Sequence, residues 1–552
     1  MPDIVLTTLN AKFSHAAFGL RYLFANLGGL QPRAVIAEFD INQRPLDIAE
    51  KILALLERRA PARLDGSCIS ELAAPVLGAP PQIIGFGIYI WNVAETTEVI
   101  TAIKRVRPDI KIILGGPEVS YETEGQPIVE LADHVITGEA DLKFAEVCGQ
   151  LLERRAPARL EGVNSSELAE PVLGAPLPKI IAAELPEFSR IALPYDFYTA
   201  ADLAHRIIYV EASRGCPFTC EFCLSSLDIP VRQVPLDQFL AAMQRLLDRG
   251  LKQFKFVDRT FNLHAVTSKA ILEFFLARYQ PGHFYHFEMI PDRLPAELRA
   301  VIAKFPPGSL QFEVGIQTFN PEVGTLISRR QNYERLADNF NFLRKETGVH
   351  IHADLIIGLP GETVESFGVG FDRLIALGPQ EIQVGILKRL RGTPIIRHDA
   401  EWQMIYNAHP PYDILQNKLI DFATMQRLRR FAKYWDLVGN SGNFVETLPL
   451  ICNSGPPPFA CLVLFSDWLY AQLGRTDTIA LVRLAEKIFE FLTGELKLEK
   501  KFAAETLWRD WQRLGHRDPP ELLREFLPKE SQVHRAAKTS ALPKRQARHL
   551  TA

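Results

Sequence analysis

Three cysteines close together in the middle of the chain give the clearest chemical signal in the sequence. Cys216, Cys220 and Cys223 form a C-x3-C-x2-C pattern. Cysteine thiolates are the usual ligands of cubane iron–sulfur clusters, and an electron-carrier cluster is held by four of them. Three thiolates on one short segment therefore predict a cluster in which one iron remains open to an exchangeable ligand.

A structural zinc site is the main alternative for these cysteines, and a set of inert core thiols is a second one. Zinc commonly takes four Cys or His ligands from paired C-x2-C motifs or from a later H-x3–5-H motif. The sequence has no second C-x2-C pair, although His264, His283 and His286 follow the cysteines. The spacing favours the iron–sulfur interpretation and leaves zinc open.

The overall composition is that of a chain with several globular domains. There are 552 residues, of which 47% are hydrophobic and 23% charged, and the formal net charge is −3. Such a balance excludes wholesale disorder and gives no global positive field, so we expect no nucleic-acid partner. The seven cysteines, three clustered and four scattered, do not suggest a disulfide framework. No apolar run is long enough to span a membrane. We therefore expect a cytoplasmic protein.

Residues 1–195 alternate between short β-branched runs and helical patterns. This alternation predicts a doubly wound parallel α/β sheet, in which ligands bind beyond the carboxyl ends of the strands. Gly115-Gly116 and Gly138-Glu139 follow two of the expected strands, although glycines can also serve only as turns. The expected strands are Ile4–Thr7, Val35–Phe39, Ile83–Tyr89, Lys111–Leu114 and His134–Thr137.

An internal duplication interrupts this first domain. Residues 57–80 and 153–176 match at 19 of 24 positions, and each copy follows a helical pattern. Helix-to-strand connections are usually about 2–6 residues long. Both copies are thus interpreted as insertions on the edge of the sheet opposite the ligand side, with no chemical role.

The rest of the chain predicts a second α/β domain and then helices. Residues 196–400 should form a (βα)6 partial TIM barrel, with its active site at the carboxyl ends of the strands. Residues 401–528 have a mainly helical pattern, and residues 529–552 resemble a disordered basic tail. The expected barrel strands are Ile207–Val210, Gln253–Val257, Phe284–Met289, Leu310–Val314, His350–Ile357 and Glu381–Leu387.

The cysteine segment resembles the signature of the radical S-adenosylmethionine (SAM) superfamily, C-x3-C-x-aromatic-C, with Phe222 at the aromatic position. The resemblance implies that a [4Fe-4S] cluster binds SAM at its open iron and cleaves it to a 5′-deoxyadenosyl radical. Later segments resemble the superfamily's SAM-contacting segments in the same order, and the Arg329 position is that of the arginine that pairs with the SAM carboxylate. The implied cofactor-binding residues outside the cysteines are Phe222, Asp258, Thr260, Glu288, Glu313, Gln317, Arg329, Gly358 and Pro360.

The N-terminal domain resembles the cobalamin (B12)-binding domain that is fused to one class of radical SAM enzymes. The resemblance assigns Gly115, Gly116, Gly138 and Glu139 to cobalamin binding. The Asp-x-His-x-x-Gly motif of other cobalamin proteins is absent, and His15 is more readily explained as a loop or packing histidine than as a lower cobalt ligand. The region after residue 400 resembles an uncharacterised C-terminal domain found in a bacterial subset of these proteins.

Together these resemblances imply a radical SAM enzyme that performs cobalamin-dependent methyl transfer to a substrate carbon. Two alternatives stand beside methyl transfer. The enzyme could instead catalyse a radical cyclisation or rearrangement, or the chain could be an iron–sulfur electron-transfer protein. The enzyme would need an external low-potential electron donor of the flavodoxin or ferredoxin type. Whether its substrate is a small molecule, a lipid or a peptide does not follow from the sequence.

Overall fold

The computed structural model describes residues 2–57, 82–153, 176–228, 230–527 and 543–549. They form two compact units, which are described separately. The first unit comprises Met1–Tyr209, Arg232–Leu251 and Leu390–Gly392, and the second comprises Val210–Val231, Lys252–Arg389 and Thr393–Ala552. The duplicated segments, predicted as insertions, lie almost entirely outside the described residues, at 58–81 and 154–175.

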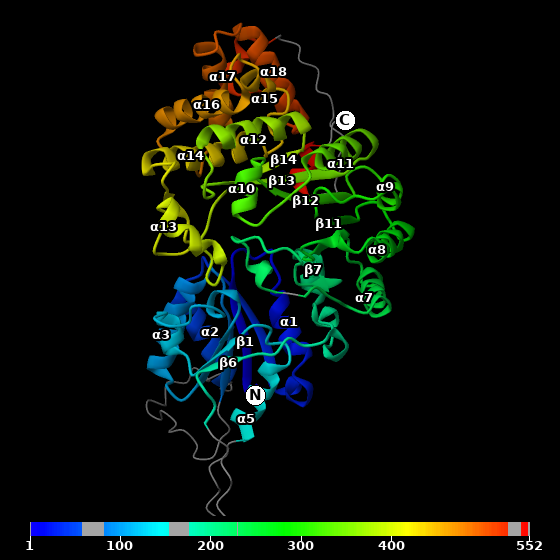
Figure 1. Cartoon of the computed structure of the whole chain (residues 1–552), viewed down its shortest axis with the longest axis vertical. Helices are drawn as coiled ribbons and strands as arrows, with labels where there is room; N and C mark the ends of the chain where they lie inside the picture. Colours follow the sequence, from blue (N-terminus) through cyan, green and yellow to red (C-terminus); the bar gives the residue numbers. More distant parts are fainter. Residues whose placement is uncertain (1, 58–81, 154–175, 229, 528–542, 550–552) are drawn as a thin grey trace, which may run out of the picture. The chain divides into compact units, whose positions relative to one another are not determined.

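The first unit contains the predicted doubly wound sheet (Figure 1). Its six strands pair in parallel in the order β2-β1-β3-β4-β5-β6. Their bounds are β1 Ile4–Asn10, β2 Ala34–Asp40, β3 Ile83–Gly87, β4 Lys111–Gly115, β5 His134–Thr137 and β6 Ile180–Ala182.

Helices cover both faces of this sheet because its central strands β1, β3, β4 and β5 are buried on both sides. One core cluster joins the sheet to α2, α3 and α4, and the other joins it to α1 and α5. This arrangement confirms the predicted fold of the domain. The helices are α1 Phe18–Ala25, α2 Pro45–Glu57, α3 Val93–Val106, α4 Pro127–Leu131, α5 Lys143–Glu153 and α6 Ala200–His205.

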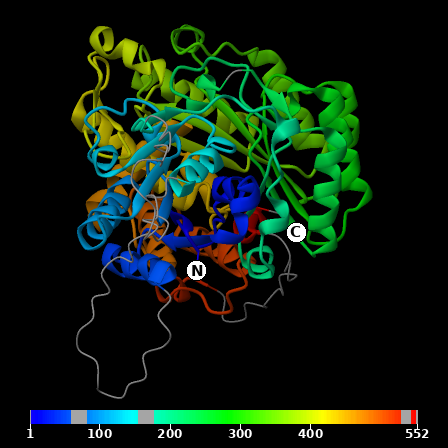
Figure 2. The same ribbon diagram turned by 90° about the horizontal axis from the view of Figure 1, so that it is seen from below.

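The second sheet has six strands in the order β14-β13-β12-β11-β10-β7, so strands that follow one another along the chain are neighbours. Its register is parallel from β10 to β14, and helices of residues 265–346 lie along its outer side (Figure 2). An ordered, unclosed βα series is the predicted partial barrel. The strands are β7 Ile208–Val210, β10 Gln253–Phe256, β11 Phe284–Met289, β12 Leu310–Gln317, β13 His350–Ile357 and β14 Glu381–Ile386.

The helices that alternate with these strands are amphipathic or apolar. In the sequence, the short strands β8 Ser213–Arg214 and β9 Arg232–Gln233 come before and after the segment that carries the cysteines. The helices are α7 Leu236–Asp248, α8 Ala265–Ala277, α9 Ala296–Ile302, α10 Pro321–Leu326, α11 Tyr333–Glu346 and α12 Val364–Leu377.

The remaining residues are mainly helical, as predicted, apart from the short antiparallel pair of β15 Ile405–Tyr406 and β16 Ile414–Gln416. Over the described ranges, no helix has both the length and the apolar character that crossing a membrane requires. The helices are α13 Asp399–Trp402, α14 Phe422–Val438, α15 Leu448–Cys452, α16 Pro458–Leu473, α17 Leu481–Gly494, α18 Lys500–Arg513, α19 Glu521–Arg524 and α20 Lys544–His549.

Helix α20 corrects the prediction that residues 529–552 form a disordered tail. Arg545 of this helix makes an ion pair with Glu381 of β14 at 2.8 Å and another with Asp436 of α14 at 2.6 Å. Composition alone could not reveal these contacts, because they join residues that lie more than 100 positions apart. The other residues of the predicted tail, 529–542 and 550–552, lie outside the described part of the chain.

Candidate functional site

The three cysteines lie on the segment that follows β7, at the carboxyl end of the first strand of the second sheet. Cys220 is buried, whereas Cys216 and Cys223 are half-buried. Gly215 permits the tight entry into this segment, since its φ is +96° and an added Cβ would lie 2.8 Å from the Asp228 carbonyl oxygen. The backbone thus holds the cysteines in a compact loop.

The cysteines line one cavity of about 330 Å³ at this end of the sheet. Other walls of the cavity come from the ends of β11, β12 and β13 and from the segment that follows β12. The structure therefore brings together most of the residues that the sequence predicts for the site. Those that line the cavity are Cys216, Cys220, Cys223, Phe222, Thr260, Glu288, Glu313, Gln317 and Arg329.

Over the described residues, no three His, Cys, Asp or Glu side chains are close enough to share a single metal ion. The cysteines are thus arranged around a cavity and not around one point. Burial, and to a lesser degree the neighbouring Cys223 and Cys220, raises the pKa of the Cys216 thiol. Binding of a metal centre by these thiols would release protons.

Arg329 connects the cysteine loop to the sheet. Its Nη1 atom lies 3.3 Å from the Cys220 sulfur, and its Nη2 atom donates to the carbonyl oxygen of Gly315. At Gly315 an added Cβ would lie 2.5 Å from the Gln317 amide nitrogen and 3.3 Å from Arg329. A larger residue at this position would displace the ends of both cavity side chains.

The acidic residues of the cavity have basic partners. Glu288 accepts from Arg259 at 3.0 Å, and burial raises the pKa of this carboxyl despite the arginine. Glu313 accepts from His286 at 3.0 Å. Burial alone would raise the pKa of Glu313, but the histidine hydrogen bond and the Lys255 charge outweigh it and hold that pKa well below its ordinary value.

Four buried polar atoms of cavity residues have no hydrogen-bond partner among the described residues: Thr260 Oγ1, Arg329 Nε, Gln331 Oε1 and Asp354 Oδ1. Buried polar groups are normally paired, so such atoms mark places where a polar ligand can bind. A ligand with amino, carboxylate and hydroxyl groups, as SAM has, fits this set.

Three predicted site residues do not line the cavity. Asp258 is buried behind the cysteine loop, where it accepts from the Ala212 amide at 3.0 Å and from the Ser213 hydroxyl at 2.6 Å, and burial raises its pKa to about 7. Gly358 packs against the side chain of Ile414. The structure also leaves Pro360 outside the cavity lining.

Asp354 is a cavity residue that the sequence prediction missed. A signal for it exists in the strand His350–Ile357, where His350, His352 and Asp354 alternate with apolar residues. Because successive side chains of a strand point to opposite faces, this alternation marks one polar face. Arg259 was missed for another reason: it lies between two residues that were assigned and carries no pattern of its own.

In the first unit, the predicted cobalamin-binding residues lie at the carboxyl ends of β4 and β5. Gly116 and Gly138 have φ of +108° and +78°, and the Gly138 backbone N–H donates to the Ser120 hydroxyl at 3.2 Å. Glu139 makes an ion pair with Arg232. Exposed Trp91, stacked on Tyr89 at 4.4 Å, lies just beyond β3.

These features fit a large planar cofactor. Backbone without Cβ atoms and an exposed aromatic ring at the ligand edge of a doubly wound sheet can approach a macrocycle closely. At Gly116, however, the glycine is also required by the fold itself, because an added Cβ would lie 2.4 Å from the Ile88 carbonyl oxygen.

His15 is engaged in packing within the same unit. Its ring stacks on Tyr209 with centroids 6.0 Å apart, and its Nδ1 atom contacts the Tyr209 hydroxyl. This contact favours the interpretation of His15 as a packing histidine.

Fold and site together define a radical SAM protein with an N-terminal cobalamin domain, and comparison with protein families agrees. Residues 4–148 match the B12 binding domain, residues 210–371 match the radical SAM superfamily, and residues 400–550 match a protein family of unknown function, DUF4080. The chain therefore carries these three domains in this order. The recognition made from the sequence is confirmed, and the matched domains imply a [4Fe-4S] cluster, SAM and cobalamin.

Two curated proteins illustrate the relationship. An uncharacterized methyltransferase of Pyrococcus horikoshii, PH0819, is 26% identical over 301 residues, which is 54% of this chain and 64% of that protein. The cobalamin-dependent radical SAM methyltransferase TokK of Streptomyces tokunonensis is 23% identical over 376 residues, covering 61% of this chain and 51% of TokK. The alignments thus span about half to two thirds of the length of these relatives.

A solved structure shows the same fold over nearly the whole chain. The cobalamin-dependent S-adenosylmethionine radical enzyme OxsB, solved with aqua-cobalamin bound, superposes with a TM-score of 0.57 over 92% of this chain and 80% of OxsB, at 13% identity. At this identity the likeness concerns the fold alone.

Proposed function

We propose that this protein is a cobalamin-dependent radical SAM methyltransferase that methylates a carbon atom of its substrate. The observation that carries the proposal is the single cavity lined by all three cysteines and by the polar residues expected to contact SAM. The relatives named as methyltransferases support the methyl transfer.

The residues of the second unit can hold both the cluster and SAM. When bound, the cluster supplies the electron that cleaves SAM to methionine and a 5′-deoxyadenosyl radical, and cobalamin supplies the methyl group. Cys216, Cys220 and Cys223 would bind three irons and leave the fourth for SAM. Arg329, beside the Cys220 sulfur, places a positive charge where the SAM carboxylate would bind.

The cavity also protects a reactive species from water. Met289, Ile290, Pro291 and Phe218 provide apolar walls next to the polar groups. Apolar walls of this kind limit the access of water to the substrate-derived and SAM-derived radicals. Arg259 and Thr260 on the loop after β10 close the polar side of the same cavity.

Radical SAM enzymes generally need an external reductant. We propose a small flavodoxin-type or ferredoxin-type protein in this role and a cytoplasmic location, because a low-potential donor and an oxygen-sensitive cluster need a reducing compartment. The substrate would be a small molecule, a lipid or a peptide.

The decisive experiment is anaerobic reconstitution of the purified chain with iron and sulfide, followed by dithionite, SAM and quantification of 5′-deoxyadenosine. Wild-type protein should form 5′-deoxyadenosine, and Cys216→Ala should not. Cys452→Ala is the matched control, because Cys452 is a buried thiol of helix α15 outside the cavity. Absence of 5′-deoxyadenosine from the wild-type reaction under every reducing condition would overturn the proposal.

Cobalamin binding is tested separately by incubating the chain with hydroxocobalamin and removing the free corrinoid by gel filtration. Retained corrinoid absorbance at a ratio near one per chain is expected. Gly138→Val should reduce retention, because a β-branched residue is strained at a φ of +78°. Failure of the wild-type chain to retain corrinoid would leave a radical SAM enzyme without the methyl-transfer cofactor.

A further inference from the structure

A row of ionisable side chains crosses four neighbouring strands of the second sheet. In the strand register, Glu288 of β11 is beside Glu313 of β12, Glu313 is beside His352 of β13, and His352 is beside Glu381 of β14. The first two carboxylates line the SAM cavity, whereas His352 and Glu381 do not. A row of charges at one level of a sheet couples its members electrostatically, because each lies about 5 Å from the next strand.

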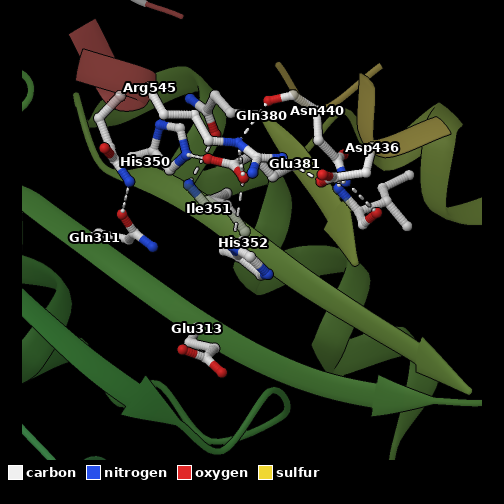
Figure 3. Close-up of polar contacts among 12 residues, drawn as sticks. Gln311, Glu313, His350, Ile351, His352, Gln380, Glu381, Asp436, Asn440 and Arg545 are labelled. Carbon is white, nitrogen blue, oxygen red and sulfur yellow. Dashed lines mark hydrogen bonds and ion pairs between the residues drawn. The ribbon is translucent and has the colours of Figure 1, made fainter. Parts of the chain in front are cut away.

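His352 lies between Glu381, the last member of this row, and the cavity residue Asp354 (Figure 3). Its Nε2 atom lies 3.4 Å from Oδ1 of the cavity residue Asp354, and its Nδ1 atom lies 3.7 Å from a Glu381 oxygen. Burial would lower the pKa of His352, but Asp354, Glu381 and Glu313 outweigh burial and raise it above the ordinary value. His352 thus holds its proton more tightly than a free imidazole does, and its two ring nitrogens face Asp354 and Glu381.

Glu381 is held in turn by two basic groups. It is only 2% exposed, and it accepts from His350 Nε2 at 2.8 Å and pairs with Arg545 Nε at 2.8 Å (Figure 3). A buried carboxylate is costly unless it is paired on several sides. Arg545 therefore balances negative charge on Glu381 that the residues of the sheet compensate only in part.

Arg545 comes from helix α20, in the domain that matches the family of unknown function. Further contacts hold this helix in place. Gln546 donates to Gln311 of β12 at 2.7 Å, His549 contacts the Asn440 carbonyl oxygen at 2.9 Å, and Arg545 also pairs with Asp436. Helix α20 thus lies against the amino-terminal starts of β12, β13 and β14, at the end of the strands opposite the cysteines.

Charged groups on the neighbouring elements also act on this row, among them His350 and Arg545 at Glu381. His286 of β11 and Lys255 of β10 act through Glu313, to which they lie at 3.0 and 3.9 Å. Arg329 acts on Asp354 from the cavity side. The basic groups outside the row can pair with Glu313 and Glu381, whereas His352 lies in register between Glu313 and Glu381.

We propose that His352 is a positioning residue of the SAM site: in its charged form it holds Asp354 and compensates the cavity carboxylates, and helix α20 keeps it in place through Arg545 and Glu381. This inference rests on the proposed function, since it concerns the same cavity. It gives the C-terminal domain a specific role, which is to support the SAM site from the opposite end of the sheet.

The first test measures SAM affinity of the reconstituted protein as a function of pH. Wild-type affinity should fall as pH rises through the raised pKa of His352, because deprotonation removes the charge that holds Asp354. In Glu381→Gln the same fall should occur at lower pH, since one of the carboxylates that raise this pKa is gone. In His352→Gln this step should be absent, with SAM bound weakly at all pH values. A purely structural role would weaken binding without moving the pH profile.

The second test concerns helix α20 and uses two arginines of the same helix. Arg545→Met should weaken SAM binding by about tenfold, the effect of losing about 1.4 kcal/mol, and Arg545→Lys should restore part of it. Arg548→Met is the matched control, because the contact that Arg548 provides is its backbone carbonyl, which accepts from Arg513. SAM affinities equal to wild type in both Met variants would overturn the role of the helix.

Hydrogen exchange of the cluster-free chain gives a readout that does not depend on any cofactor. Glu381→Gln and Arg545→Met should speed exchange of residues 543–549, whereas Arg548→Met should not. The two proposals fail differently. If wild-type protein binds no SAM at any pH, the proposed function fails; if it binds SAM with an affinity that is independent of pH and unchanged in His352→Gln, only the role of His352 fails.

Discussion

Glu221 lies between Cys220 and Cys223 in the sequence, and it is 2% exposed. Its carboxylate contacts His398 Nε2 at 2.8 Å, accepts from the Ser328 hydroxyl at 2.7 Å and pairs with Arg397. Its amide also donates to the Ile327 carbonyl oxygen at 3.1 Å. One buried side chain therefore ties the cysteine loop to two segments that are distant in sequence.

Glu221→Gln should destabilise the cluster-free chain and lower its iron content after reconstitution. The amide cannot pair with Arg397 and His398, so a cost of about 2 to 4 kcal/mol in the free energy of unfolding is expected. Urea unfolding followed by circular dichroism measures the first effect, and iron analysis measures the second. Glu525→Gln, which changes an exposed carboxylate just after α19, is the control and should alter neither quantity.

The buried carboxyl group of Asp258 should make the free energy of unfolding depend on pH. Its pKa is raised to about 7 in the folded chain by burial, against 3.8 in an exposed carboxyl. Between these two values the folded state holds a proton that the unfolded state has lost, so the stability contributed by this group falls as pH rises from about 4 to about 7. Asp258→Asn removes this loss, which amounts to at most about 4 kcal/mol.

The measurement is the unfolding free energy of wild type and Asp258→Asn at pH 5 and pH 8. The variant should gain stability relative to wild type at the higher pH, while Asp477→Asn, an exposed substitution, should track wild type at both. A difference between Asp258→Asn and wild type that is the same at both pH values would contradict the assignment of the raised pKa.

At the scale of elements, the end of β12 shapes the SAM site. The pairing of β12 with β13 becomes irregular between Gly315 and Gln317, and Gln317 has a φ of +73°. Bulges of this kind redirect side chains near functional sites. Here the irregularity directs Gln317 into the cavity, while the Gly315 carbonyl accepts from Arg329.

Gly315→Ala should weaken SAM binding by about tenfold or more with little change in stability. The new methyl group would displace the flexible ends of Gln317 and Arg329, and these are cavity side chains. Gly385→Ala on β14 is the matched control, since its nearest neighbour would be the Leu355 carbonyl oxygen at an ordinary 3.5 Å. Isothermal titration of reconstituted protein with SAM compares the two. Equal affinities would show that the glycine is not required for the site.

The strands were predictable where apolar periodicity is unbroken. β11 and β13 have the predicted bounds, whereas β12 extends three residues beyond its predicted end, because Gly315 and the unusual backbone of Gln317 interrupt the pattern. β6 was missed since it is short and largely exposed. This segment is a strand because it pairs with β5, and no local sequence pattern reveals that pairing.

The site was predictable to the extent that its residues lie in local motifs. The cysteines and Arg329 belong to such motifs, whereas the row that contains His352 and Glu381 depends on strand register and on a helix far along the chain. A parallel sheet places residues from distant segments at the same level, and register is set by packing of whole strands. The spacing of residues within one segment therefore does not predict which residues of different strands lie side by side.

At the scale of the whole molecule, both sheets obey the same rule for ligand sites. Gly115 and Gly138 end strands of the first sheet, and the cysteine loop follows β7 of the second. Parallel α/β sheets bind ligands at the carboxyl ends of their strands, so the opposite ends are free to vary. The duplicated sequence begins where helix α2 ends, at the non-ligand end of the first sheet.

The first duplicated segment should therefore be dispensable for cobalamin binding. The two residues that border residues 58–81 are already close, because Gln82 donates to the Leu56 carbonyl oxygen at 3.0 Å and Arg107 contacts both Glu57 and Gln82. Replacing residues 58–81 with a Gly-Ser linker of about four residues needs no rearrangement of α2 or β3, and shortening a loop changes the closure entropy by less than about 2 kcal/mol. The shortened chain should retain one corrinoid per chain after gel filtration and unfold at the same urea concentration as wild type. Loss of corrinoid with an unchanged unfolding midpoint would mean that the segment contributes to the cobalamin site.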